Sequence, residues 1–251
     1  MKFYDDFIGE DACNLIENYS GGGDSEEQVL ENIAKSTSDW YFKDKIITYS
    51  YNVYGHRSKN INEIDLDNYI LFSGCSHTFG VGLELETTYP YLLSKKLGCD
   101  YYNLAVSASG PDVVQHNILN WYYSIQKKPK LVIIQWPDHS RFLSYNTEYK
   151  NLIPRGNWQG DNDILKFIID SEDYGLFNAR KKLITDLLSN VIKEPVIKFN
   201  YASQSNYDSD PIKMRKLDLA RDLSHAGVLS HKVFSETLNQ IANEKLKLHL
   251  P

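Results

Sequence analysis

Strand-like and helix-like segments alternate from residue 68 onward, and this alternation restricts the possible folds more than any other feature. The segment YILFSG at 69–74 is apolar almost throughout, which is typical of a strand covered on both faces. Strands separated by helices of the lengths seen here form right-handed βαβ units and a parallel sheet. The predicted strands are 69–74, 100–106, 129–136 and 194–202, and the predicted helices are 89–98, 111–128, 176–193 and 228–246.

Residues 143–175 interrupt this rhythm. The stretch SYNTEYKNLIPRGNWQGDND is predicted to be a long irregular excursion, and DILKFIIDSE after it a helix. Insertions of this kind often cover a binding site, although they can also be padding. We expect one main domain over 67–251 that carries this insertion.

Residues 1–66 are predicted to form an N-terminal extension of short elements that packs on the main domain. After a glycine-rich turn, Asp24 or Ser25 is the expected N-cap of a helix that runs to about Ser36. A phosphate-binding loop is the alternative for this turn, but the acidic residues that follow would repel a phosphate. Residues 45–58 alternate like two strands around a turn at 52–55.

Charge and cysteine content exclude several classes of function. The chain has 33 acidic and 27 basic residues, for a net charge of −6, so neither nucleic acid nor an anionic membrane is an expected partner. Its three cysteines, Cys13, Cys75 and Cys99, are too few and too scattered for a disulfide framework or a zinc site. No signal-peptide pattern and no apolar run of about 18 residues is visible. We expect a cytoplasmic or phage-associated protein, of unknown oligomeric state.

Polar clusters follow the predicted strands, at the points where those strands end. They are Gly74–Thr78, Ser107–Gly110 and Pro137–Arg141, and a further cluster, ARDLSHAG at 220–227, precedes the last helix. Ligands of an open parallel sheet bind beyond the carboxyl ends of its strands, where such loops converge. These clusters therefore predict the functional site.

A serine nucleophile is the chemistry that these clusters favour. A serine hydroxyl needs a base within hydrogen-bonding reach, and the base needs a third group to orient it. Asp222 and His225 supply that pair on one loop, because a spacing of three lets the carboxylate hold Nδ1 of the imidazole while Nε2 faces outward. Ser76 is the predicted nucleophile, and the backbone N–H groups of Ser76 and Ala108 are placed to bind a developing oxyanion.

The same residues carry a resemblance to the SGNH, or GDSL-type, hydrolase family. FSGCSHTFGVGL is similar to the family's first block, G-D-S-x-T, with Ser76 as nucleophile. YNLAVSASGPD resembles the second block, with Ala108 and Gly110 as backbone contributors to the oxyanion hole, and DLSH resembles the final D-x-x-H block. The resemblance covers about residues 68–245. It implies a flavodoxin-like α/β/α sandwich of three layers with a five-stranded parallel sheet, and the hydrolysis of acetyl or short acyl esters.

Three positions depart from the family pattern. Cys75 replaces the aspartate of the first block, and Ala108 stands where the second block has glycine. Pro137 occupies the place of the third-block asparagine, whose side chain completes the oxyanion hole. Loss of one such donor lowers kcat by about 10²–10³. His139, Ser140 and Gln135 are the candidates to replace it.

The remaining polar residues of the clusters are candidates for supporting and substrate-binding roles. His77 is next to Ser76 in sequence, which favours a supporting or substrate-binding role over that of base. Arg141 can bind an anionic group of the substrate or pair with Asp138. His231 is expected on the outer face of the last helix. A metal site formed by His139 and Asp138 near His225 is not favoured, because the spacings match no helix-borne ligand pair such as H-E-x-x-H.

The leading hypothesis is a serine esterase that needs no metal and no cofactor and acts on a glycan ester or a small ester. Two alternatives remain open. The departure at Pro137 and the 18 tyrosines favour a glycan-binding or scaffold module that has lost activity. Acyl transfer to a sugar hydroxyl would use the same three residues while excluding water.

Overall fold

The computed structural model describes residues 1–20, 23–138, 140–148, 151–156, 158, 162–173, 175–201 and 212–247. Within them, five parallel strands form one sheet in the order β11-β10-β7-β5-β6. Numbered along the chain and read from β6, this order is 2-1-3-4-5, the flavodoxin-like order. The predicted α/β fold is confirmed. The strands are β5 (Tyr69–Ser73), β6 (Asp100–Asn103), β7 (Leu131–Trp136), β10 (Val196–Tyr201) and β11 (Lys213–Met214).

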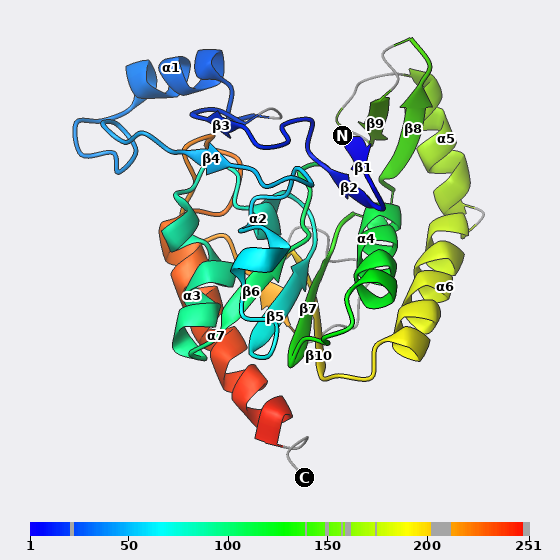
Figure 1. The fold of residues 1–251 in the computed structure, drawn as a ribbon. Coiled ribbons are helices and arrows are strands. Elements are labelled where there is room, and N and C mark those ends of the chain that lie inside the picture. Colours follow the sequence, from blue (N-terminus) through cyan, green and yellow to red (C-terminus); the bar gives the residue numbers. More distant parts are fainter. Residues whose placement is uncertain are drawn as a thin grey trace.

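Helices cover both faces of this sheet, which gives the three predicted layers (Figure 1). On one face α4 (Pro111–Ser124) and α6 (Leu176–Val191) share a core with Tyr69 and Leu71 of β5. On the other face α3 (Tyr89–Lys96) and α7 (Val228–Lys247) pack against Ile70 and Phe72. Successive residues of a strand point to opposite faces, so a strand buried on both sides must be apolar at every position. This explains the uninterrupted apolar runs in the sequence.

The N-terminal segment crosses the carboxyl end of the sheet, above α2 (Ser76–Phe79) (Figure 1). Its helix begins after Ser25, whose hydroxyl accepts a hydrogen bond from the backbone of Gln28, so Ser25 is the N-cap. The prediction of two strands around residues 52–55 is wrong, because β4 pairs with β3 instead. The division at residue 66 stays a prediction. The elements are β1 (Lys2–Tyr4), β2 (Phe7–Gly9), β3 (Ile16–Glu17), α1 (Glu26–Lys35), β4 (Tyr49–Ser50) and the 3-10 helix η1 (Ile61–Glu63).

The region 143–175 is more regular than its sequence indicates. Strands β8 (Phe142–Asn146) and β9 (Asn151–Arg155) form an antiparallel hairpin, and α5 (Asn162–Asp173) follows as predicted. A second 3-10 helix, η2 (Leu85–Thr87), leads into α3. None of the helices in the described ranges is long and apolar enough to cross a membrane.

Candidate active site

The turn after β5 places Ser76 at the start of a short helix, at the carboxyl end of the sheet. Cys75 is the N-cap of α2 and Ser76 its first residue, with the side chain of Ser76 only 6% exposed. Gly74 allows this sharp turn, because a Cβ there would lie 2.3 Å from Oγ1 of Thr78. The apolar run therefore ends in glycine because no larger residue fits between β5 and α2.

The side chain of Gln135, at the end of β7, holds this turn in place. Its Oε1 accepts hydrogen bonds from the backbone N–H of Cys75 at 3.2 Å and from Oγ1 of Thr78 at 3.0 Å. Its Nε2 lies 3.3 Å from Sγ of Cys75. Gln135 is fully buried. Its amide therefore fixes the nucleophile turn, a role different from the oxyanion contact considered from the sequence.

Asp222 and His225 form the pair that their spacing predicts. Oδ2 of Asp222 is hydrogen-bonded to Nδ1 of His225, and Oδ1 accepts from the backbone N–H groups of Ser224 at 3.1 Å and His225 at 3.0 Å. Leu223 takes a left-handed conformation, φ 53°, which closes the loop tightly. Burial acts to raise the pKa of Asp222, but these hydrogen bonds and the adjacent imidazole outweigh it, so the pKa is lowered. The carboxylate therefore stays ionised and holds the ring.

The ring of His77 packs against that of His225, with centroids 5.0 Å apart and the planes at 64°. Burial, followed by the proximity of His225 and His231, lowers the pKa of His77 well below its usual value, so the ring is neutral. The contact brings the residue next to Ser76 against the predicted base. The side chain of Ser76 itself contacts Sγ of Cys75 at 3.9 Å, and no hydrogen bond among the described residues joins it to His225.

The loop after β6 adopts a constrained turn at the predicted oxyanion donor. Ala108 has a φ of 57°, in the left-handed region where glycine is preferred. The turn is held by Ser109, whose hydroxyl donates to the carbonyl of Gly74 at 3.1 Å. Oε1 of Glu10 accepts from the backbone N–H of Ser107 at 2.6 Å. The N-terminal segment thus contacts the loop at the residue before Ala108.

Gly110 is the N-cap of α4 and lies where two chain segments meet closely. A Cβ there would be 2.6 Å from Oδ1 of Asp112 and 2.7 Å from the carbonyl oxygen of Arg141. This close approach, at an extended φ of −101°, explains the glycine. Its proposed contribution to the oxyanion hole stays a prediction.

The loop after β7 carries the other candidates for the missing oxyanion donor and for substrate binding. The Ser140 hydroxyl donates to Oδ1 of Asp138 at 2.8 Å, and His139 lies outside the described residues. Arg141 stacks on the ring of Trp158 at 4.9 Å, and its contact with Asp138 is a backbone hydrogen bond. Within the part of the chain that is described, Arg141 therefore has no ion pair with Asp138. Its role toward substrate stays a prediction.

His231 does not lie on the outer face of the last helix, so that prediction is wrong. It is 1% exposed, and its Nδ1 accepts a hydrogen bond from the backbone N–H of Tyr89 at 3.0 Å. Burial lowers its pKa to about 3. His231 therefore ties α7 to α3 as a neutral side chain. Among the described residues, no group of three or more His, Cys, Asp or Glu side chains is arranged to hold a metal ion.

Several residues that shape the site were not identified from the sequence. Arg57 is 1% exposed and donates to the carbonyls of Gly80 at 2.7 Å and Leu83 at 2.7 Å, which fixes the chain after α2. Glu10 and Asp24 reach loops of the main domain as acceptors, Glu10 from the backbone N–H of Ser107 and Asp24 from Nε of Arg221. All three lie in the N-terminal segment, and no local motif marks them.

The sheet order agrees with the fold that the resemblance implies, a three-layer α/β/α sandwich with a five-stranded parallel sheet. A scan of the sequence against protein-family models finds no match, and a search of curated proteins finds none.

Three solved structures that resemble the chain each share 14% sequence identity with it. They include a carbohydrate esterase family 2 enzyme with a carbohydrate-binding domain from Corynascus thermopiles (Myceliophthora fergusii), with a TM-score of 0.42 over 72% of this chain and 67% of that one. An acetyl xylan esterase from the rumen bacterium Butyrivibrio proteoclasticus has a TM-score of 0.42 over 73% and 65%. A member of the lipolytic G-D-S-L family from Veillonella parvula has a TM-score of 0.34 over 70% and 73%. The chain thus spans about two thirds of the length of the two esterases.

Proposed function

We propose that the protein is a serine ester hydrolase in which Ser76 is the nucleophile, His225 the general base and Asp222 the group that orients His225. The observation that carries this proposal is the Asp222–His225 hydrogen bond on a loop whose imidazole packs against His77, the neighbour of Ser76. Because Nδ1 is engaged by the carboxylate, Nε2 is the atom available to accept a proton.

The reaction proceeds through an acyl-enzyme. Oγ of Ser76 attacks the ester carbonyl carbon while its proton passes to Nε2 of His225. The C–O bond to the alcohol breaks, and His225 returns the proton to the departing alkoxide. Water then attacks the acyl group with His225 again as base, which releases the carboxylic acid and restores Ser76. Catalytic hydrogen bonds are often long without substrate, so in this proposal the hydrogen bond from Ser76 to His225 forms when the substrate binds.

The developing oxyanion is bound by the backbone N–H groups of Ser76 and Ala108. The backbone of Gly110 is a further contributor to this oxyanion hole. Two hydrogen bonds fix the turn that carries Ala108 before substrate binds. The hydroxyl of Ser109 donates to the carbonyl of Gly74, and Glu10 accepts from the backbone N–H of Ser107. Donors fixed in place before the reaction are the effective ones, because they cost no reorganisation in the transition state. Pro137 offers no donor, so we expect a modest kcat. The proposed substrates, acetyl or short acyl esters of a glycan or small alcohol, follow from the resemblance to SGNH hydrolases.

Replacement of Ser76 by Ala tests the proposal. The S76A variant should keep its fold, lose release of p-nitrophenol from the acetyl ester and lose labelling by a fluorophosphonate probe. Ser189→Ala, at an exposed position of α6, is the matched control and should behave like wild type. Turnover retained by S76A would refute Ser76 as nucleophile.

Two other outcomes would favour the alternatives. A wild-type protein that neither hydrolyses esters nor reacts with the probe would be a binding module, a possibility favoured by Pro137 at the position of the missing donor. A protein that reacts with the probe but forms acylated sugar in preference to free acid would be an acyltransferase.

A further inference from the structure

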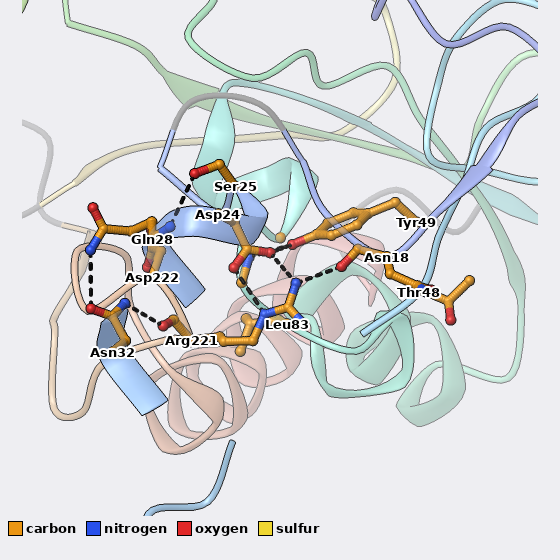
Figure 2. Close-up of polar contacts among 12 residues, drawn as sticks. Asn18, Asp24, Ser25, Gln28, Asn32, Thr48, Tyr49, Leu83, Arg221 and Asp222 are labelled. Atoms are coloured by element: carbon orange, nitrogen blue, oxygen red, sulfur yellow. Dashed lines mark hydrogen bonds and ion pairs between the residues drawn. The ribbon is translucent and has the colours of Figure 1, made fainter. Parts of the chain in front are cut away.

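A buried ion pair joins the N-terminal segment to the loop that carries Asp222 and His225. Nε of Arg221 donates to Oδ1 of Asp24 at 2.9 Å, and Nη2 donates to Oδ2 at 2.7 Å. The side chains of Arg221 and Asp24 are 2% and 0% exposed. Figure 2 shows the two charged groups facing each other. This two-point geometry fixes both the position and the plane of the guanidinium. Asp222 is the next residue in the chain.

The same carboxylate is also linked to the chain that follows the nucleophile helix. The hydroxyl of Tyr49 donates to Oδ2 of Asp24, and it accepts from the backbone N–H of Gly82 at 2.7 Å. Gly82 follows α2, which begins at Ser76. Asp24 is therefore bonded, directly or through Tyr49, to both chain segments that supply the proposed nucleophile and base.

Hydrogen bonds to both backbone groups of Arg221, its N–H and its carbonyl, also hold this residue in place. Its N–H donates to the carbonyl of Gly82 at 3.1 Å, and its carbonyl accepts from Nδ2 of Asn32 in α1 at 3.0 Å (Figure 2). Gly23 lies against the next residue, since a Cβ there would be 3.5 Å from Oδ2 of Asp222. The N-terminal segment thus covers the carboxylate that orients His225 and fixes the backbone just before it.

We infer that Asp24 is a positioning residue for the proposed Ser76–His225–Asp222 site, which acts by tying the 220–225 loop to the chain after α2 through Arg221 and Tyr49. This inference rests on the proposed function. Asp24 touches no substrate in this scheme. Its part is to keep the carboxylate of Asp222 against His225, and that pair opposite the turn that carries Ser76.

A role in stability alone is the competing explanation. Replacing a buried ion pair by apolar residues of similar size often leaves a protein as stable as before, whereas removing one partner leaves a charge buried alone. The two roles can therefore be separated by removing both charges together. A stable variant without the ion pair would still lack the two hydrogen bonds between the side chains of Asp24 and Arg221.

The test uses the full chain with Asp24→Leu and Arg221→Met combined, and Tyr49→Phe as a milder second variant. Glu31→Gln is the control, because Glu31 pairs with Lys35 on the surface of α1. Each protein is checked for folding by circular dichroism. We then measure kcat and KM for p-nitrophenyl acetate. The proton on Nδ1 of His225 is followed by NMR in ¹⁵N-histidine-labelled protein, with His225→Gln to assign its signal.

The expected result is a fall in kcat of about 10- to 100-fold with KM changed less than about twofold, because misplacement by about 1 Å costs this much. The resonance of the proton on Nδ1 of His225 should move upfield, since a loosened carboxylate accepts a weaker hydrogen bond from Nδ1. Tyr49→Phe should shift both quantities in the same direction by less, and Glu31→Gln should shift neither. A folded double variant with wild-type kcat and a wild-type Nδ1–H resonance of His225 would overturn the inference.

Failure of the proposed function would look different. Wild-type protein without turnover or probe labelling would refute the esterase proposal, and the Nδ1–H resonance of His225 would then test the role of Asp24 by itself. A shifted resonance in the double variant would still support positioning, and an unshifted one would overturn it. If the double variant does not fold, the same comparison of Tyr49→Phe with wild type gives the decision.

Discussion

Oε1 of Gln135 accepts a hydrogen bond from the backbone N–H of Cys75 at 3.2 Å, one residue before the proposed nucleophile. The amide also accepts from Thr78 within α2, so one side chain at the end of β7 holds both ends of the turn. The central strand of the sheet therefore sets the position of Ser76. A family pattern would lead one to look for a donor to the oxyanion after β7, whereas here the last polar residue of the strand turns inward.

Replacement of Gln135 by Met should therefore impair the nucleophile turn. The change keeps the volume but leaves the N–H of Cys75 buried without its acceptor, at a cost of about 1–3 kcal/mol. We expect a lower unfolding free energy in urea and slower labelling of Ser76 by a fluorophosphonate. Gln240→Met, at an exposed position of α7, is the control. Wild-type labelling in Q135M would show that the turn keeps its shape without the amide.

Asp222→Asn should leave the fold intact and reduce kcat by about 10⁴, because an amide favours the wrong tautomer of His225. The pKa of Asp222 is lowered in the folded protein, so the ionised carboxylate stabilises the fold above its unfolded pKa, and this contribution is lost as pH falls through the folded value. Denaturation curves between pH 3 and 7 should therefore depend less on pH in D222N. Activity within about tenfold of wild type would contradict the assigned role.

Glu10 makes the unfolding free energy fall as pH rises, which is opposite to the effect of Asp222. Burial raises its pKa to about 7, although the hydrogen bond from Ser107 acts to lower it, as does the N-terminal ammonium, while Glu17 and Asp11 act to raise it. A raised pKa stabilises the fold below the unfolded value of 4.5, and this contribution is lost as pH rises through about 7. The loss amounts to at most about 3 kcal/mol.

Glu10→Gln keeps an acceptor for the N–H of Ser107 and removes the titration. Urea unfolding at pH 5 and pH 8 should therefore show a smaller loss of stability in E10Q than in wild type. Glu31→Gln, on the exposed side of α1, should leave the loss unchanged. An identical pH dependence in E10Q and wild type would show that Glu10 is ionised throughout this range.

The main-domain strands could be predicted because burial on both faces leaves no choice but apolar residues, as in 69–73 and 131–136. The β8–β9 hairpin could not. Its strands are mostly half-buried and show no clear alternation of buried and exposed residues. Pro154 within β9 also argues against a strand, because proline donates no hydrogen bond to a neighbouring strand. Tertiary pairing with β8 decided the structure there.

The contacts of the site also differ in whether the sequence predicts them. Asp222 and His225 were predictable because their contact depends on a spacing of three residues, which the sequence displays directly. The contact between Asp24 and Arg221 joins residues 197 apart, and nothing near Asp24 distinguishes it from a solvated acid at the start of a helix. Ser25 alone accounts for the helix cap. The sequence pattern therefore gives no sign that its neighbour Asp24 is buried in an ion pair.

Ala108 lies in the left-handed region at φ 57°, and glycine at this position should relieve that strain. An L-residue with a Cβ pays about 1–2 kcal/mol there, while glycine loses about 0.5–1 kcal/mol through the greater freedom of the unfolded chain. We therefore expect Ala108→Gly to raise the unfolding free energy by up to about 1 kcal/mol, or the Tm by about 2 °C. Ala179→Gly within α6 is a control of opposite sign, because glycine in a helix interior costs about 1 kcal/mol. Calorimetry of the two variants decides the question, and a lower Tm in A108G would mean that the alanine methyl contributes packing that outweighs the backbone strain.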